Sequence, residues 1–180
     1  MTFKELQLIN HIQQALTEEG YTNPTPIQEQ AIPEILAGQD LVACAQTGTG
    51  KTGAFAIPIL NLIHRIVGSP KKKKHIRTLV VTPTRELAIQ IDESFKTYGK
   101  YTGVKSLVIF GGVNQVPQVN ELKQGVDVLI ATPGRLLDLH KQGYIDLNHM
   151  HHLVLDEADQ MLDMGFINDV KKIIKLTPDN

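Results

Sequence analysis

The segment "AQTGTGKT" (residues 45–52) combines residue types that suit a loop binding phosphate groups. Gly48 and Gly50 permit a backbone that turns its amide groups toward phosphate oxygens. The ammonium group of Lys51 can reach β- and γ-phosphates, and the hydroxyl group of Thr52 can bind Mg²⁺. The usual pattern begins with glycine, whereas this segment begins with alanine. The other positions fit, and the segment predicts a nucleotide-phosphate site.

A second group of chemically active residues follows the apolar run 153–155, where Asp156, Glu157 and Asp159 crowd together. Neighbouring carboxylates repel one another, and their burial is costly. One interpretation is the solvated first turn of a helix, where acidic residues suit the helix dipole. The other is a divalent metal ion. A phosphate loop needs a second carboxylate to hold its magnesium, which favours Asp156 as ligand and Glu157 as general base.

The elements that must position these residues are short apolar runs separated by helical patterns. Five runs are rich in Val, Ile and Leu and are continuous rather than alternating, as in strands covered on both faces: 41–45, 78–82, 106–110, 127–132 and 152–156. Helical spacing of apolar residues fills the intervals after the first two runs. This alternation predicts an α/β fold with a mostly parallel central sheet, right-handed crossovers and helices on both faces.

Each predicted strand is followed by a polar or glycine-rich cluster. In an open parallel sheet the ligand crevice lies beyond the carboxyl ends of the strands, so all five clusters are expected at one edge. Glycine and proline also punctuate ordinary loops, and this explains any single cluster. It does not explain five of them at the same edge.

Composition is that of an ordinary globular domain, with 180 residues, 42% hydrophobic residues and 21% charged residues. No apolar stretch has the length of a membrane span. The net charge of −1 argues against binding of nucleic acid by bulk electrostatics, and the basic cluster 71–74 is interpreted as a solvated surface loop. The lone cysteine, Cys44, is expected in the core, which fits a reducing, cytoplasmic compartment.

With these residues in place, the chain resembles the DEAD-box family of ATP-dependent RNA helicases, including its bacterial RhlE-like members. The motifs occur in order along nearly the whole chain: Phe3, "GYTNPTPIQ" (20–28), "AQTGTGKT" (45–52), "PTRELA" (83–88), Gly111-Gly112, "TPGR" (132–135) and "DEADQMLDMGF" (156–166). Alanine at position 45 is normal in this family, so the departure noted above supports the resemblance.

The resemblance implies ATP and Mg²⁺ as cofactors and assigns a role to each matching residue. Gln28 should read the adenine edge, and Tyr21 should lie against the base or brace the segment around it, although both also fit a capped helix after a proline-rich turn. Lys51, Asp156 and Glu157 should be catalytic, Thr52 and Asp156 should hold Mg²⁺, and Asp159 should couple the ATP site to a later motif. The remaining nucleotide contacts are expected from Ala45, Gln46, Thr47, Gly48, Thr49 and Gly50.

The resemblance also implies an RNA track made of Pro83, Thr84, Arg85, Gly112, Thr132, Pro133, Gly134 and Arg135. Helix N-termini, glycine amides and two arginines can hold phosphates locally despite the neutral net charge. Such contacts carry little sequence information, while the 2′-hydroxyl group can distinguish RNA from DNA.

The domain organisation implied is one N-terminal RecA-like domain over residues 1–180, with its adenine-reading segment at about residues 1–30. The family's Ser-Ala-Thr motif and second RecA-like domain do not occur before Asn180. We therefore expect a monomeric fragment that binds nucleotide weakly and neither hydrolyses ATP appreciably nor unwinds RNA. Two other hypotheses remain open: an RNA clamp gated by nucleotide, and a small-molecule kinase.

Overall fold

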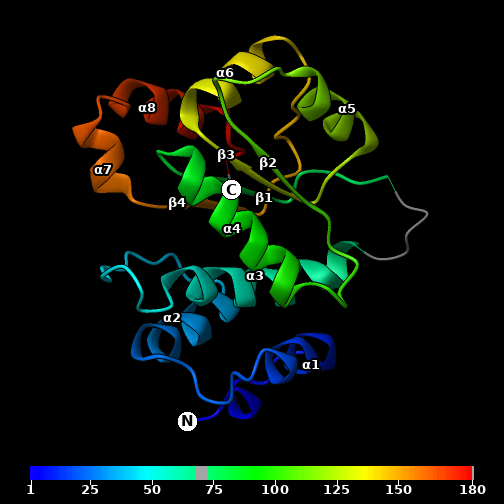
Figure 1. Ribbon diagram of the computed structural model, residues 1–180, viewed down its shortest axis with the longest axis vertical. Coiled ribbons are helices and arrows are strands. Elements are labelled where there is room, and N and C mark those ends of the chain that lie inside the picture. The colour runs from blue at the N-terminus through cyan, green and yellow to red at the C-terminus, as the bar shows by residue number, and fades with distance from the viewer. Residues whose placement is uncertain (68–72, 180) are drawn as a thin grey trace. The chain divides into compact units, whose positions relative to one another are not determined.

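The structure is a computed structural model that describes residues 1–67 and 73–179. The chain divides into two compact units, which Figure 1 shows with their elements labelled. Unit 1 comprises Met1–Pro70 and Glu93–Val104, and unit 2 comprises Lys71–Asp92 and Lys105–Asn180. Each unit has its own set of buried residues.

Unit 1 is helical. Its elements are the 3₁₀ helix η1 (Phe3–Leu6), α1 (Asn10–Glu18), α2 (Pro26–Leu36), α3 (Lys51–Val67) and the second half of α4 (Arg85–Tyr98). Helix α2 begins where Pro26 fixes the first helical φ angle, and the side chain of Gln28 accepts a hydrogen bond from the backbone of Thr25. Helices α2 and α3 pack against each other. Fully buried side chains of this unit include Ile12, Leu16, Ile32, Ile57 and Leu60.

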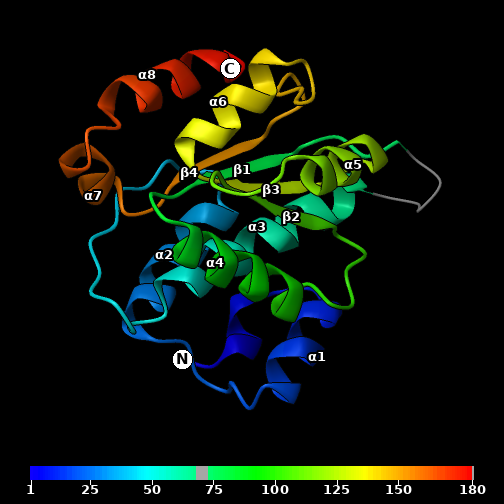
Figure 2. The same ribbon diagram turned by 45° about the horizontal axis from the view of Figure 1, so that its top comes forward.

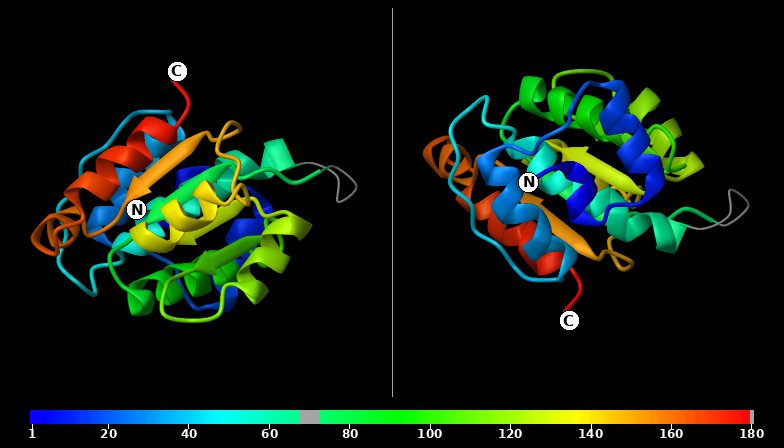
Figure 3. Two further views of the ribbon diagram at one scale, coloured as in Figure 1. Left: turned by 90° about the horizontal axis from the view of Figure 1, so that it is seen from above. Right: turned by 90° about the horizontal axis from the view of Figure 1, so that it is seen from below.

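Unit 2 is built on a parallel sheet of four strands in the order β2-β3-β1-β4. The strands are β1 (Thr78–Val81), β2 (Ser106–Ile109), β3 (Val128–Ala131) and β4 (His152–Leu155), and the left panel of Figure 3 shows them side by side. The helices are α5 (Val116–Gln124), α6 (Pro133–Lys141), α7 (Ala158–Asp163) and α8 (Ile167–Leu176), with the first half of α4. The predicted α/β fold with a parallel sheet is confirmed.

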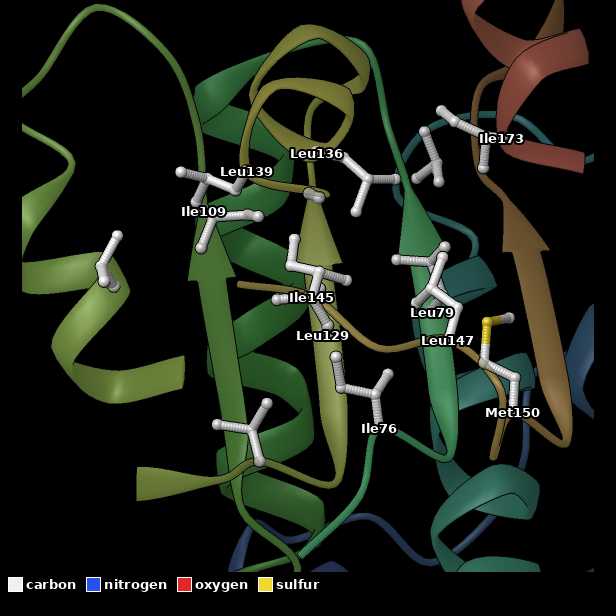
Figure 4. Close-up of a cluster of buried hydrophobic side chains, with 14 of the residues drawn as sticks. Ile76, Leu79, Ile109, Leu129, Leu136, Leu139, Ile145, Leu147, Met150 and Ile173 are labelled. Carbon is white, nitrogen blue, oxygen red and sulfur yellow. The ribbon is translucent and has the colours of Figure 1, made fainter. Parts of the chain in front are cut away.

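Burial across the sheet explains the continuous apolar runs. All four residues of each central strand, β1 and β3, are buried, whereas those of the edge strand β4 are only partly buried. On one face, Leu79 and Leu129 pack with Leu136 and Leu139 of α6 and with Ile173 of α8 (Figure 4). Helices α6 and α8 lie next to each other above this face in Figure 2. A strand with apolar neighbours on both sides needs no alternation.

The prediction of a fifth strand at 41–45 is wrong. These residues carry no strand, and the side chain of Val42 is 95% exposed. Cys44 is also exposed, so its expected place in the core is wrong too. An apolar run forms a strand only where a neighbouring edge pairs with its backbone, and no strand among the described residues pairs with this one. Composition alone could not reveal the missing neighbour.

A buried carboxylate, Asp127, joins the segments that enter the sheet. Its Oδ2 atom accepts hydrogen bonds from Lys74 Nζ at 2.7 Å and from the backbone of Lys105 at 2.8 Å. Its backbone carbonyl accepts the amide of Arg77 at 2.8 Å. The interpretation of the basic cluster as purely solvated is therefore wrong for Lys74. Lys73 is exposed, and positions 71 and 72 lie outside the described residues.

In the part of the chain that the structure describes, no helix combines the length and the apolar character needed to cross a membrane.

Candidate nucleotide and RNA site

A cavity of about 230 Å³ lies in unit 1, between the segment of residues 1–30 and the glycine-rich loop 45–52. Its lining includes Tyr21, Gln28, Gly48 and Gly50, all of which the sequence had assigned to the nucleotide. The other lining residues are Phe3, Leu16, Asn23, Thr25, Ile57 and Tyr98. The fold thus brings two motifs that are separate in sequence to one concave surface.

Gln28 is the polar centre of this surface, although its side chain is only 6% exposed. Its Oε1 atom accepts a hydrogen bond from the backbone of Thr25 at 3.0 Å, and its Nε2 atom donates one to the carbonyl of Gly50 at 3.0 Å. A primary amide has two N–H groups and two lone pairs, so these bonds leave one donor and one acceptor. That remaining pair is complementary to an adenine edge, which also offers one donor and one acceptor.

Two glycines make room for the Gln28 amide. A β-carbon at Gly50 would lie 2.6 Å from Nε2 of Gln28, and one at Gly53 would lie 2.8 Å from the same atom. Gly50 also has a φ of +81°, a backbone angle that residues other than glycine rarely adopt. Sequence reasoning assigned Gly50 to phosphate alone and missed Gly53. The available signal for Gly53 was a glycine inside a helix, which often marks close packing.

Aromatic side chains form the outer part of the cavity. Tyr21 is 49% exposed, and its ring centroid lies 6.3 Å from that of Tyr98. Burial raises the pKa of the Tyr98 hydroxyl, with a further contribution from Tyr21, so this side chain stays neutral. Phe3 is buried, and its backbone amide bonds to the carbonyl of Thr22 at 3.1 Å. Sequence reasoning missed Tyr98, because no local pattern places the end of α4 here.

The phosphate loop has the backbone that its sequence predicted. Gly48 and Gly50 both have positive φ angles, +83° and +81°. The hydroxyl group of Thr49 donates to the carbonyl of Gln46 at 2.6 Å and closes the turn. Lys51 and Thr52 are the first residues of α3, whose N-terminal amides and dipole attract anions. The loop and the helix agree with the prediction. The strand that was predicted to precede them, at residues 41–45, does not form.

Four of the five predicted clusters do meet at one edge of the sheet in unit 2. They follow the carboxyl ends of the four strands, at 82–85, 110–113, 132–135 and 156–159. Parallel pairing in register places these ends together. The fifth cluster, the phosphate loop, belongs to unit 1.

Arg85 links the clusters after β1 and β2. Its guanidinium carbon lies over the ring of Phe110, 4.8 Å from the centroid, which is a cation–π contact. This contact holds the guanidinium group near the carboxyl-terminal edge of the sheet. Within the same cluster, Pro83 follows β1, and the hydroxyl oxygen of Thr84 accepts the amide of Leu87 at 3.3 Å. This bond caps the start of α4.

Arg135 links the clusters after β2 and β3. Its two terminal nitrogens donate to Gln118 Oε1 at 2.9 Å and to the carbonyl of Val113 at 2.8 Å. Gln118 in turn donates to the carbonyl of Phe110 at 3.2 Å. The structure therefore shows Arg135 holding the loop that contains Gly112, a role that sequence reasoning did not foresee. Phe110 was expected at the end of a strand, and no sequence signal singled out Gln118.

The cluster after β3 begins helix α6. Thr132 has an extended backbone at the N-cap, Pro133 is the first helical residue, and Gly134 is the exposed second residue. The amide of Thr132 bonds to the carbonyl of Ile109 at 3.2 Å, which continues the pairing of β3 with β2. This turn presents helix N-terminal amides at the sheet edge.

The carboxylates after β4 occupy different environments. Asp156 is 6% exposed, and its backbone amide bonds to the carbonyl of Val81 at 2.9 Å. Glu157 has a left-handed backbone, φ 54° and ψ 47°, which is uncommon outside glycine and clusters at functional sites. Asp159 is exposed in the first turn of α7. The solvated helix start therefore describes Asp159 and does not describe Asp156.

Comparison with known proteins identifies the family to which the chain belongs. Residues 25–180 match the DEAD/DEAH box helicase family. ATP-dependent RNA helicase CshA of Limosilactobacillus reuteri is 44% identical over 180 residues, which cover 100% of this chain and 35% of that protein. DEAD-box ATP-dependent RNA helicase RhpA of Helicobacter pylori is 45% identical over 177 residues, covering 98% of this chain and 35% of that protein.

ATP-dependent RNA helicase DeaD of Buchnera aphidicola is 45% identical over 178 residues, which cover 98% of this chain and 29% of that protein. The chain thus spans about a third of the length of these relatives. The match covers both the cavity in unit 1 and the sheet edge in unit 2. The chain belongs to the DEAD/DEAH box helicase family.

Proposed function

We propose that this chain is the N-terminal RecA-like domain of an ATP-dependent RNA helicase, whose ATP hydrolysis is stimulated by RNA and coupled to local separation of RNA duplexes. The observation that carries the proposal is the Gln28 amide, bonded to the phosphate loop at Gly50 and lining a cavity with one donor and one acceptor to spare. A helicase of this kind selects adenine, and this amide supplies the selection.

ATP would bind with its base against Tyr21 and Gln28 and its phosphates on the loop Ala45–Thr52. The fit rests on the positive-φ glycines and on a helix that begins at Lys51. Thr52 and Asp156 would be the ligands of Mg²⁺, because hydroxyl and carboxylate oxygens are the ligands that this ion prefers. The metal ion would neutralise charge on the phosphates.

The proposed chemistry is the attack of a water molecule on the γ-phosphate. Glu157 would orient and deprotonate this water, and Lys51 would stabilise charge on the β- and γ-phosphates. The left-handed backbone of Glu157 turns the chain sharply between Asp156 and helix α7, so the two carboxylates need not point the same way. Asp159 is exposed in the first turn of α7 and would couple the ATP site to a later motif of the family.

RNA would lie along the sheet edge of unit 2 and would be held by its backbone. Arg85 is oriented there by Phe110, and the turns at Pro83–Thr84, Gly112 and Thr132–Arg135 offer backbone amides. The partner that completes the ATPase and RNA sites would be a second RecA-like domain of the same protein. We further propose that the domain alone is monomeric and that the protein works in the cytoplasm, where the exposed thiol of Cys44 stays reduced.

The test is steady-state ATP hydrolysis by the full-length protein, with and without a panel of unrelated RNAs. We expect RNA to stimulate hydrolysis, and Glu157→Gln to lower the rate on the order of a hundredfold or more while nucleotide still binds. The matched control is Asp163→Asn, an exposed carboxylate in helix α7, which begins directly after Glu157.

Each alternative gives a different result. An RNA clamp would bind RNA in the presence of ATP, with hydrolysis that neither RNA nor Glu157→Gln alters. A small-molecule kinase would hydrolyse or transfer phosphate without any response to RNA. Either result would overturn the proposed function.

A further inference from the structure

Three potential metal ligands meet at the edge of unit 2 that lies opposite the candidate RNA track. His75 precedes β1, whereas Asp146 and His149 lie between α6 and β4. Each offers one ligand atom, and these atoms all lie within 4.8 Å of one another. Because β1 and β4 are parallel, the residues that precede them share the amino-terminal edge. The cluster is therefore about one strand length from the residues that follow the strands.

We propose that His75, Asp146 and His149 form a site for a transition-metal ion, with Zn²⁺ as the physiological candidate. Two imidazoles and one carboxylate are a common ligand set for zinc, and they leave a coordination position for water. Hard cations such as Mg²⁺ prefer sites made of oxygen ligands alone. The site is separate from the Mg²⁺ ligands of the proposed ATPase.

The arrangement of the side chains is close to what a bound ion requires. Asp146 Oδ2 lies 3.6 Å from His149 Nδ1, and the rings of His75 and His149 are stacked with centroids 3.8 Å apart. Tetrahedral zinc places its ligand atoms about 3.3 Å apart. Ligand atoms within 4.8 Å of each other can reach that spacing by side-chain rotation, in which the two imidazole rings leave their stacked arrangement so that their nitrogens converge on the ion.

Hydrogen bonds already orient the carboxylate. Asp146 Oδ1 accepts the backbone amide of Asn148 at 3.0 Å and the side-chain amide of the same residue at 2.7 Å. These bonds occupy one oxygen and leave Oδ2 facing His149. The side chains of Asp146 and His149 are 58% and 41% exposed, so an ion can enter from solvent.

A bound ion would cross-link two segments that enter neighbouring strands. One segment leads into β1 and the other into β4, and both strands run side by side. Zinc would therefore stabilise the folded state of unit 2, because the unfolded chain does not hold the three ligands together. At a free zinc concentration of about one hundred times the dissociation constant, the expected rise in Tm is about 5 to 10 °C.

The experiment is zinc titration at pH 7.5 against a chromophoric zinc indicator, with Tm measured on the same samples. All proteins carry Cys44→Ser, because an exposed thiol binds zinc by itself. We expect one site in this background and its loss, by at least tenfold in affinity, in His75→Ala and in His149→Ala. The matched control is His151→Ala, an exposed histidine close to the cluster.

A second measurement uses no variant that could fail to fold. Zinc should protect His75 and His149 from acylation by diethylpyrocarbonate in the Cys44→Ser protein, as read by peptide mass spectrometry, and should leave His151 reactive. Absence of a zinc site, equal binding in the alanine variants, or loss of binding in the His151 control would overturn the proposal. Failure of the helicase proposal would leave this result unchanged, because neither readout depends on ATP or RNA.

Discussion

The side chain of Gln28 shows how much a single residue contributes to this molecule. Its amide joins the start of α2 to the phosphate loop through Thr25 and Gly50, and it does so in a nearly buried position. A hydrogen bond of this kind makes a net contribution of about 1 kcal/mol to the free energy of unfolding. A buried polar atom without a partner lowers that free energy by more. The same amide therefore positions the loop and, under the proposed function, would also recognise the base.

We predict that Gln28→Ala removes the preference for adenine over guanine. The variant loses the donor and acceptor that face the cavity, so the ratio of ATP to GTP affinity should fall about tenfold, which corresponds to about 1.4 kcal/mol. Competition binding with a fluorescent nucleotide measures the ratio. Gln30→Ala, at an exposed position of the same helix, should leave it unchanged.

A glycine supplies an independent check of this prediction. Gly53→Ala places a β-carbon 2.8 Å from the amide nitrogen of Gln28, so it should reduce the same ratio although the amide is still present. Alanine favours a helix by about 1 kcal/mol over glycine, so the loss cannot be attributed to a weaker α3. A wild-type protein that binds GTP as well as ATP would contradict the role of Gln28.

At the scale of elements, the sheet edge of unit 2 is a set of turns tied together by side chains. Arg85 stacks on Phe110, and Arg135 bonds to Gln118 and to the loop at Val113. These contacts order three strand-to-helix connections against one another. A preordered surface loses less entropy when it binds a phosphate backbone.

We predict that Arg85→Ala and Arg135→Ala each weaken binding of unrelated RNAs by similar factors, because the contacts are to the backbone. Arg85→Ala should also lower the salt dependence, by about one phosphate contact. Arg135→Ala should share its effect with Gln118→Ala, so the double variant should lose less than the sum. Fluorescence anisotropy at several salt concentrations measures both. A loss restricted to one RNA sequence would indicate base readout instead.

The opposite edge of the sheet depends on Asp127. We predict that Asp127→Ala lowers the free energy of unfolding by about 2 to 3 kcal/mol, since it removes the buried carboxylate that accepts hydrogen bonds from Lys74 Nζ and from the backbone amide of Lys105. Asp127→Asn keeps an acceptor for the Lys105 amide and should cost about half as much. Urea unfolding followed by circular dichroism gives both values. Asp179→Ala, at an exposed position, is the control, and an equal effect there would refute the role of Asp127.

At the scale of the whole molecule, the chain carries the phosphate loop in unit 1 and the carboxylates in unit 2, and it spans about a third of its relatives. Phosphoryl transfer needs positive charge opposite the γ-phosphate, and an arginine finger contributes about 10³-fold or more in rate. Under the proposed function, the second RecA-like domain supplies this charge.

We therefore predict that residues 1–180 bind ATP or ADP only weakly, with a Kd of about 1 µM or more, and show negligible hydrolysis and no unwinding. Addition of the second domain as a separate chain at high concentration should restore part of the RNA-stimulated hydrolysis. Isothermal titration and a coupled ATPase assay measure the two properties. Robust RNA-stimulated ATP hydrolysis by this chain alone would refute the proposal that hydrolysis requires a second RecA-like domain.

The sequence by itself determined the features that depend on short-range chemistry. The runs around Leu79, Leu107, Leu129 and Val154 became strands, and the loop before Lys51 took positive φ angles at its glycines. Burial on both faces and the backbone freedom of glycine depend on a few adjacent residues. The strands and the turn of the loop can therefore be predicted from the sequence. Parallel order then placed four polar or glycine-rich clusters at one edge.

Only the tertiary structure decided which distant groups meet. The run 41–45 has the composition of a strand but no neighbour among the described residues, and its Val42 is exposed. Likewise, the bonds from Gln28 to Gly50, from Arg135 to Gln118 and from Lys74 to Asp127 join residues that are far apart in the sequence. Their geometry is set by the packing of whole helices and strands, which the pattern of adjacent residues does not encode.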